Sequence, residues 1–281
     1  MAEITAAAVG KLRESSGAGL MDCKKALTET NGNFEVALDW LRKKGAATAV
    51  KKGDRDAREG VIHAYIAPGA KVGLILEVNC ETDFVARNEN FQAFCADAAK
   101  KIAANPAADL EADRVAAVAK LGENIKIGRH QRVEVAGNGL VAAYIHTGAK
   151  VGVLVEVGAG KEATTAHEDF KQLVRDITLQ IAAAHPTVVG REEVSADAVA
   201  KEREIASTSE AVKNKPPQAV AKIVEGKLEK FFQGICLLEQ GFVKNPDLTV
   251  KAHTAAVAKQ LGDEITIRHF VRLQVGESAA A

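Results

Sequence analysis

The chain has 281 residues, and 37 Lys plus Arg balance 37 Asp plus Glu, so the formal net charge is zero. This length allows about two domains. Without an excess of positive charge there is no whole-molecule electrostatic case for binding DNA, RNA or an anionic membrane. Aromatic residues make up only 4% of the chain, which argues against a surface built for base stacking.

The four cysteines, Cys23, Cys80, Cys95 and Cys236, are scattered and form no C-x-x-C pair. This pattern predicts a reducing compartment in which the thiols pack as small hydrophobic groups. No basic-then-apolar leader precedes the first helical pattern, and no apolar run approaches the length of a membrane span. We therefore expect a cytoplasmic protein that does not contact a membrane.

Residues 1–46 predict a domain of three short helices. Thr5 is suited to N-cap the first helix, and Asn33, after an Asn-Gly turn signal, is suited to N-cap the third. A run rich in Lys, Arg and Gly follows. We interpret residues 47–59 as a solvated basic linker, in preference to an RNA-binding arm.

An internal repeat is the most informative feature of the sequence. GAKVGLILEV at Gly69–Val78 and GAKVGVLVEV at Gly148–Val157 agree at seven of ten positions, and Gly122–Val135 matches Gly262–Val275. Each half predicts two strands, a helix and a returning strand. This indicates an α+β fold with a duplicated unit, in which helices cover each small antiparallel sheet. The expected halves are 60–139 and, interrupted by an insertion, 140–183 with 234–281.

The insertion at 184–233 predicts a helical hairpin. Two helical patterns, 194–212 and 217–232, flank a Pro-rich turn, and the first places Ala198, Ile205 and Val212 at heptad spacing. These features predict a small antiparallel coiled coil. Partner contact, dimerisation and structural decoration all remain open as roles for this hairpin.

A search for catalytic motifs finds no phosphate-binding P-loop, no nucleophile elbow and no H-E-x-x-H zinc motif. The seven histidines are dispersed, without the spacing of metal ligands. We therefore expect no catalytic residue, no bound metal and no cofactor. An enzyme whose site is assembled from distant residues remains an alternative.

Two segments carry a family resemblance: Thr82–Val85, which reads TDFV after a buried strand, and Gly17–Leu27, which reads GAGLMDCKKAL. Both are similar to signature segments of bacterial elongation factor Ts, the family that exchanges guanine nucleotide on elongation factor Tu. The resemblance covers nearly the whole chain. It implies a three-helix N-terminal domain similar to ubiquitin-associated (UBA) domains, a duplicated core and a coiled-coil insertion. Some members continue into a C-terminal helical module, whereas this chain stops soon after Val275, so the contacts of that module are not carried over.

The resemblance also implies a site. In this family the Asp-Phe pair of TDFV pushes into the nucleotide domain of the partner near its Mg²⁺, which assigns Asp83 and Phe84 that role between Thr82 and Val85. A family histidine that also intrudes on the partner corresponds to His146. The function implied is release of GDP from elongation factor Tu during translation elongation, without bond-making chemistry.

Local physics offers another interpretation of TDFV. Thr82 is suited to N-cap a helix, Asp83 to interact with its dipole, and Phe84 to join the core. The repeat argues against this, because the positions that match Asp83 and Phe84 are Glu162 and Ala163. Likewise the position that matches His146 is Ala67. A large side chain that one copy of a duplicated scaffold has and the other lacks is better explained by a partner.

The N-terminal domain predicts a second contact. A three-helix unit of this size has little interior, so some of its apolar residues should face outward. We expect an exposed Leu20–Met21 pair, rimmed by Arg13 and Lys24, to suit protein contact. The alternative is that Leu20 and Met21 pack with Leu27 in a small core.

Besides an enzyme with a dispersed site, two rival functions remain at this point. An RNA- or ribosome-binding module is motivated by the basic run from Arg42 to Arg58, although the zero net charge argues against it. A general adaptor is motivated by the likeness of the N-terminal domain to ubiquitin-associated domains.

Overall fold

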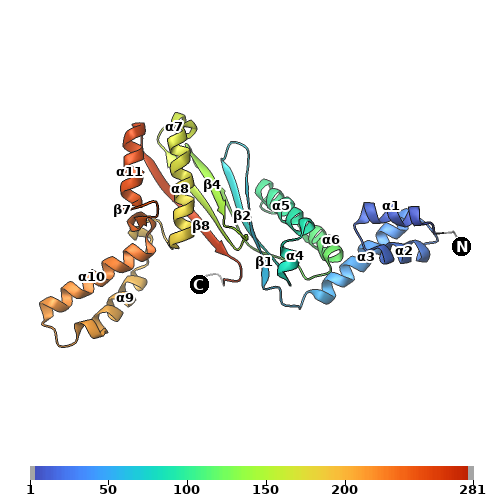
Figure 1. Ribbon diagram of the computed structural model, residues 1–281, viewed down its shortest axis with the longest axis horizontal. Coiled ribbons are helices and arrows are strands. Elements are labelled where there is room, and N and C mark those ends of the chain that lie inside the picture. Colours follow the sequence, from blue (N-terminus) through green and yellow to red (C-terminus); the bar gives the residue numbers. More distant parts are fainter. Residues whose placement is uncertain (1–3, 278–281) are drawn as a thin grey trace.

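A computed structural model of the protein describes residues 4–277 (Figure 1). At its centre two three-stranded antiparallel sheets pack face to face, and helices cover their outer sides. The three N-terminal helices lie at one end of the elongated molecule and a helical hairpin lies at the other. The expected α+β class is confirmed, while residues 278–281 of the expected second half lie outside the described part.

The N-terminal domain consists of α1 (Ala6–Ser16), α2 (Leu20–Glu29) and α3 (Phe34–Lys52). Both expected caps are present: Thr5 accepts a hydrogen bond from Ala8 N, and Asn33 accepts one from Val36 N. Each cap satisfies a backbone donor that the first turn leaves free. The helices enclose a small apolar cluster of Val9, Leu12, Cys23, Ala26, Leu27, Ala37 and Leu41.

The expected linker at 47–59 is wrong over its first half, because α3 continues through Lys52. One glycine, Gly45, interrupts an otherwise good helical sequence and costs only about 1 kcal/mol relative to alanine. That glycine lets helix α6 (Glu111–Leu121) approach closely, since a Cβ added there would lie 3.3 Å from the Cβ of Ala119. Ala49 is buried in the core of the first half. Packing thus extends the helix, and the connector shrinks to residues 53–58.

The first half of the core is built around a central strand. The sheet order is β1-β2-β3, with both pairings antiparallel. The central strand is buried on both faces, because Leu74 and Leu76 pack under the helices while Ile75 faces the second sheet. The elements are β1 (Glu59–Ile66), β2 (Val72–Cys80), α4 (Asp83–Ala86), α5 (Glu89–Ala104), α6 (Glu111–Leu121) and β3 (Lys126–Glu134).

The second half repeats this plan with the order β4-β5-β8. Val153 and Val155 pack under the helices while Leu154 faces the first sheet. The predicted strand–strand–helix–strand order is therefore confirmed in both halves. The elements are β4 (Gly139–Ile145), β5 (Val151–Ala159), α7 (Glu162–Ala166), α8 (Glu168–Ala184), β6 (Gly241–Phe242), β7 (Asn245–Thr249), α11 (Val250–Leu261) and β8 (Ile265–Gln274).

The two sheets contact each other through matched positions. Ile62 N donates to the carbonyl of Ala149 at 2.7 Å. The matching bond from the other half runs from Val141 N to the carbonyl of Ala70 at 2.8 Å. A Cβ added at Gly73 would lie 2.4 Å from Val141 Cγ1, and one at Gly152 would lie 2.4 Å from Ile62 Cγ2. The repeat therefore needs its second glycine in both copies, since only glycine permits this close approach.

The insertion folds as two helices that pack on each other, α9 (Ala196–Thr208) and α10 (Pro217–Ile235). The contact face expected for the first helix is wrong by one residue. Ile205 is 52% exposed, whereas Ala206 is fully buried against Val224 and Leu228. The small side chain of Ala206 lets α9 and α10 approach closely. The contact positions at heptad spacing on α9 are therefore Val199 and Ala206. Coiled-coil geometry for the pair stays a prediction.

Candidate functional site

The short helix α4 directly follows β2, and its start is fixed by a carboxylate from a distant segment. Glu123 accepts hydrogen bonds from Glu81 N and Thr82 N, both at 3.0 Å, and from the Thr82 hydroxyl at 2.6 Å. The same hydroxyl accepts from Val85 N at 3.3 Å, so the expected N-cap is present. We call this arrangement around Glu123 the α4 brace. It fixes the backbone that carries the side chains of Asp83 and Phe84.

Phe84 is the most exposed large apolar side chain of the described residues, at 82% of its surface. The interpretation of Phe84 as a core residue is therefore wrong. Asp83 forms an ion pair with Arg87 at 3.1 Å, one helical turn on, and Val85 is half-buried against the core. The helix thus anchors itself through Val85 and presents the ring of Phe84 to solvent.

The second half contains the same brace without the aromatic ring. Asp263 accepts from Lys161 N at 3.0 Å, which matches the bond from Thr82 N, and from the hydroxyl of Thr164 within α7 at 2.5 Å, whereas α7 has no side-chain N-cap. The bond from Thr164 lowers the pKa of the Asp263 carboxyl. Ala163, the match of Phe84, is exposed. Because both copies build the turn and only one has the ring, the fold does not require Phe84.

Glu123 and Asp263 were not singled out in the sequence analysis, although a signal existed. Each follows a glycine, Gly122 or Gly262, that ends a helix in the left-handed conformation. Both glycines are part of the second repeat match. A carboxylate conserved in register between two halves of one chain, next to a helix stop, indicates a shared structural role.

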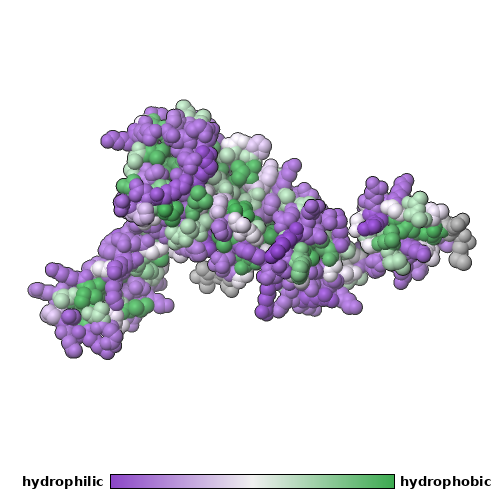
Figure 2. All heavy atoms as spheres, viewed as in Figure 1, coloured by the Kyte–Doolittle hydropathy of each residue, from purple (hydrophilic) through white to green (hydrophobic). Residues whose placement is uncertain are grey.

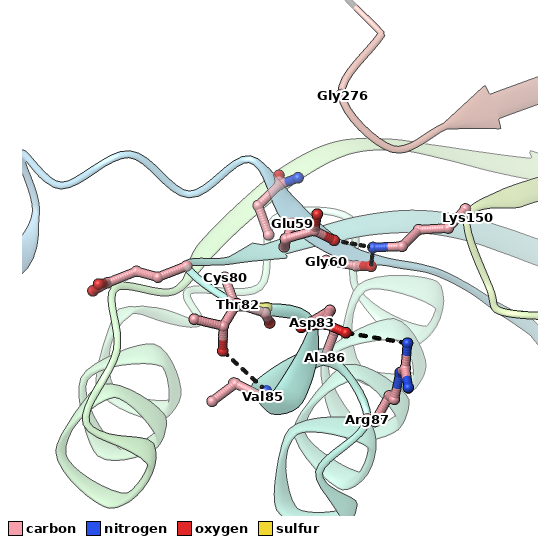
Figure 3. A network of polar contacts seen from close by, with 12 residues as sticks. Glu59, Gly60, Cys80, Thr82, Asp83, Val85, Ala86, Arg87, Lys150 and Gly276 are labelled. Carbon is pink, nitrogen blue, oxygen red and sulfur yellow. Dashed lines mark hydrogen bonds and ion pairs between the residues drawn. The ribbon is translucent and has the colours of Figure 1, made fainter.

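A cavity of about 540 Å³ lies between α4 and the second half, and Figure 3 labels its lining residues Asp83, Arg87 and Lys150. Asp83 and Arg87 line it from the first half, and Gly148 and Lys150 line it from the β4–β5 turn. Lys150 is held by an ion pair with Glu59 and by a 2.9 Å hydrogen bond to a β1 carbonyl. The structure therefore brings Asp83 next to the turn that starts at His146.

His146 itself points to a different place. It is exposed at the end of β4, and its Nδ1 lies 2.9 Å from the Tyr144 hydroxyl. His146 N donates to Val151 O at 2.9 Å, as Ala67 N does to Val72 O in the first half. The two turns therefore have the same register. The His146 side chain lines a separate cavity of about 350 Å³, which does not include Asp83.

The N-terminal contact residues are at the surface, as expected. Leu20 is 52% and Met21 72% exposed, and Arg13 and Lys24 are also exposed. The alternative small core is wrong for Leu20 and Met21, because α2 turns Leu27 inward instead. Figure 2 shows apolar side chains gathered on the visible face of this domain, and Figure 1 shows its first two helices apart from α4. The residues of the candidate site therefore lie in three separate places: on α4, beside His146 and on the N-terminal helices.

Within residues 4–277, no group of three or more His, Cys, Asp or Glu side chains is placed to hold a metal ion. No helix in that range is both long and apolar enough to cross a membrane. The four cysteines are free and buried. Burial raises the pKa of Cys80 and of Cys95 to about 12, so these thiols are protonated at neutral pH and are poor nucleophiles.

These features define the class of protein. It is a duplicated α+β scaffold whose halves share one turn geometry, and one half presents an exposed acid–aromatic pair from that turn.

Comparison with known proteins identifies the family. The model of the family described as "Elongation factor TS" matches residues 81–277. Curated relatives named "Elongation factor Ts" include one from Symbiobacterium thermophilum, 47% identical over 99% of this chain and 93% of its own length. Others come from a Nostoc species, 42% identical, and Nautilia profundicola, 44% identical, each over 99% of this chain and 94% of the relative. The chain belongs to the elongation factor Ts family, which confirms the resemblance carried by its signature segments.

Proposed function

We propose that the protein is a guanine-nucleotide exchange factor that binds elongation factor Tu with GDP and promotes release of that GDP in the cytoplasm. Family membership supports the partner. The observation that carries the site is the exposed ring of Phe84 on a braced helix, where the matching position is alanine.

The mechanism follows from how a GTPase holds its nucleotide. Phosphate-loop amides, a lysine and a Mg²⁺ ion bind the phosphates. Mg²⁺ demands near-ideal octahedral coordination, so a small displacement of its ligands weakens it. Phe84 inserts between elements of the GTPase, and Asp83 repositions polar groups near the metal. The α4 brace supports this step because a pre-ordered turn loses little conformational entropy on binding.

Two further contacts complete the proposed interface. His146 presses on the GTPase from the second half, and the Leu20–Met21 pair, rimmed by Arg13 and Lys24, docks against it from the N-terminal domain. Binding of the factor and binding of GDP then oppose each other, and linkage makes the opposition reciprocal. No bond is made or broken, so the factor is not an enzyme, and the exchange step needs no cofactor and no nucleic acid.

The test is release of a fluorescent GDP analogue from elongation factor Tu. Wild type should accelerate release strongly, and Asp83→Ala/Phe84→Ala should lose most of that acceleration while remaining folded. Glu162→Ala is the matched control, because it changes the corresponding turn of the second half, and it should act like wild type. If the double variant is as active as wild type, the push comes from elsewhere. If wild type has no effect, the exchange function is wrong and the adaptor function becomes the leading hypothesis.

A further inference from the structure

Two arginines occupy matched positions in the two halves. Arg132 on β3 pairs in register with Leu74, and Arg272 on β8 pairs with Val153, its counterpart. Two residues further along each strand the halves differ, because Glu134 stands opposite Val72 whereas Gln274 stands opposite Val151. The same scaffold therefore supplies a carboxylate to one arginine and a neutral amide to the other.

The hydrogen bonds of the two side chains reflect this difference. Arg132 forms an ion pair with Glu134 at 2.7 Å, and its Nε donates to the Ala103 carbonyl at 2.9 Å. Arg272 donates to Gln274 Oε1 at 2.8 Å, but its Nε is buried and has no hydrogen-bond partner among the described residues. Among the described residues the nearest carboxylate is that of Glu277, 3.5 Å from Nη1, which is long for an arginine–carboxylate pair.

The Arg272 side chain is only 10% exposed, so its charge lies largely out of water. A buried charge without a close counter-charge is costly. Its Nη2 lies 3.2 Å from His185 Nε2. Because arginine only donates hydrogen bonds, the His185 ring nitrogen can only accept in this contact, and an imidazole brings no negative charge. The histidine therefore does not neutralise the arginine, and among the described residues only Glu277, at 3.5 Å, offers it a negative charge.

Arg272 lines the 350 Å³ cavity between β4, α8 and β8 that also contains His146 and His185. The rest of the wall is mostly apolar, with Leu179 and Val243 among its residues. A cationic end beside an apolar wall fits a ligand that has a carboxylate on a short hydrocarbon stem. An aspartate or glutamate side chain has this chemistry.

We propose that this cavity receives an acidic side chain of a protein partner, which forms an ion pair with Arg272. The inference rests on the proposed function only for the identity of that partner, elongation factor Tu. The incoming carboxylate supplies the negative charge that Glu134 supplies in the first half, and it accepts from the Arg272 Nε–H, whose counterpart on Arg132 is bound by the Ala103 carbonyl.

The first experiment tests the site without the GTPase. The Nε–H signals of Arg272 and Arg132 are followed by ¹⁵N NMR during titration of the full chain with sodium acetate, with sodium chloride at equal ionic strength as reference. The Arg272 signal should shift saturably with acetate and not with chloride, while the Arg132 signal stays in place. Equal responses of the two signals, or none at Arg272, would overturn the proposal.

The second experiment measures affinity for elongation factor Tu with GDP. Arg272→Gln should weaken binding about tenfold or more, as expected for loss of a charge-assisted hydrogen bond. Arg132→Gln is the matched control and should bind like wild type, with the folding of both variants checked by thermal unfolding. Arg272→Lys, which keeps the charge, should recover part of the loss. If Arg272→Gln binds like wild type, this inference fails and the exchange function stands. If wild type itself does not bind, the exchange function fails and the acetate titration alone decides this inference.

Discussion

The two halves of the core are nearly the same scaffold with different surfaces. They share strand order, register, the glycines at the sheet interface and a carboxylate brace before the short helix. They differ at Phe84 against Ala163, at Gln274 against Glu134, and in the hairpin inserted only in the second half. Each half is therefore an internal control for the other: what both contain serves the fold, and what one contains alone is a candidate for binding.

The largest expected effect is on nucleotide exchange, and a substitution in α4 distinguishes a residue that serves binding from one that serves the fold. Phe84→Ala removes an exposed ring, so we expect little change in stability but a loss of exchange rate of at least about thirtyfold, the scale of an interface hot spot. The rate of GDP release from elongation factor Tu measures this, alongside thermal unfolding. A variant that loses stability and activity together would show that the ring belongs to the fold. Ala163→Phe, the reciprocal change, should leave exchange unaltered.

The sheet interface should behave in the opposite way, with equal effects in both halves. Gly73→Ala and Gly152→Ala each force a methyl group to 2.4 Å from a branched side chain of the other sheet. Overpacking of this kind costs about 1–3 kcal/mol. Denaturant unfolding should show similar losses for the two variants. A loss for only one of them would mean that the halves do not pack as equivalents.

Much of this comparison was visible in the sequence. The repeat predicted two matched antiparallel sheets, and the contrast between Phe84 and Ala163 predicted that the ring faces outward. These inferences succeeded because strand periodicity and side-chain size are local properties. The continuation of α3 to Lys52 was missed because packing of Ala49 on the core decides it. The role of Glu123 was missed for the same reason, since its partners lie some forty residues away in the chain.

Substitutions of the two carboxylates, Glu123 and Asp263, should have effects of intermediate size. Glu123→Gln removes the charge that accepts three hydrogen bonds, and we expect a loss of about 1–3 kcal/mol in stability. Asp263→Asn is its counterpart. Urea unfolding measures both. Only the Glu123 variant should also slow nucleotide exchange, because only α4 presents the ring. Equal slowing by both would indicate that α7 contacts the partner as well.

The brace at Asp263 also predicts a pH dependence. The pKa of the Asp263 carboxyl is lowered in the folded state, mainly because Thr164 donates a hydrogen bond to it. The carboxylate therefore stabilises the fold in full at pH values above the pKa of aspartate in the unfolded chain, about 3.9. The effect is lost as the pH falls below that value towards the folded pKa. Asp263→Asn should therefore unfold with a weaker pH dependence than wild type below about pH 4. Identical acid-unfolding curves would contradict this.

The smallest expected effect concerns the feature that only the second half has, the helical hairpin. At its base Arg191 forms ion pairs with Glu229 and Glu239, and its guanidinium lies 4.4 Å from the centroid of the Phe232 ring. These groups are partly exposed, so solvent screens the charges and the network contributes little to stability. Arg191→Ala should leave the global unfolding transition nearly unchanged, yet increase hydrogen exchange of the α9 and α10 amides, because it loosens only their attachment to the core. If exchange also increased in β5 and β8, the hairpin would be a structural part of the second half, and its absence from the first would have to be compensated there by other contacts.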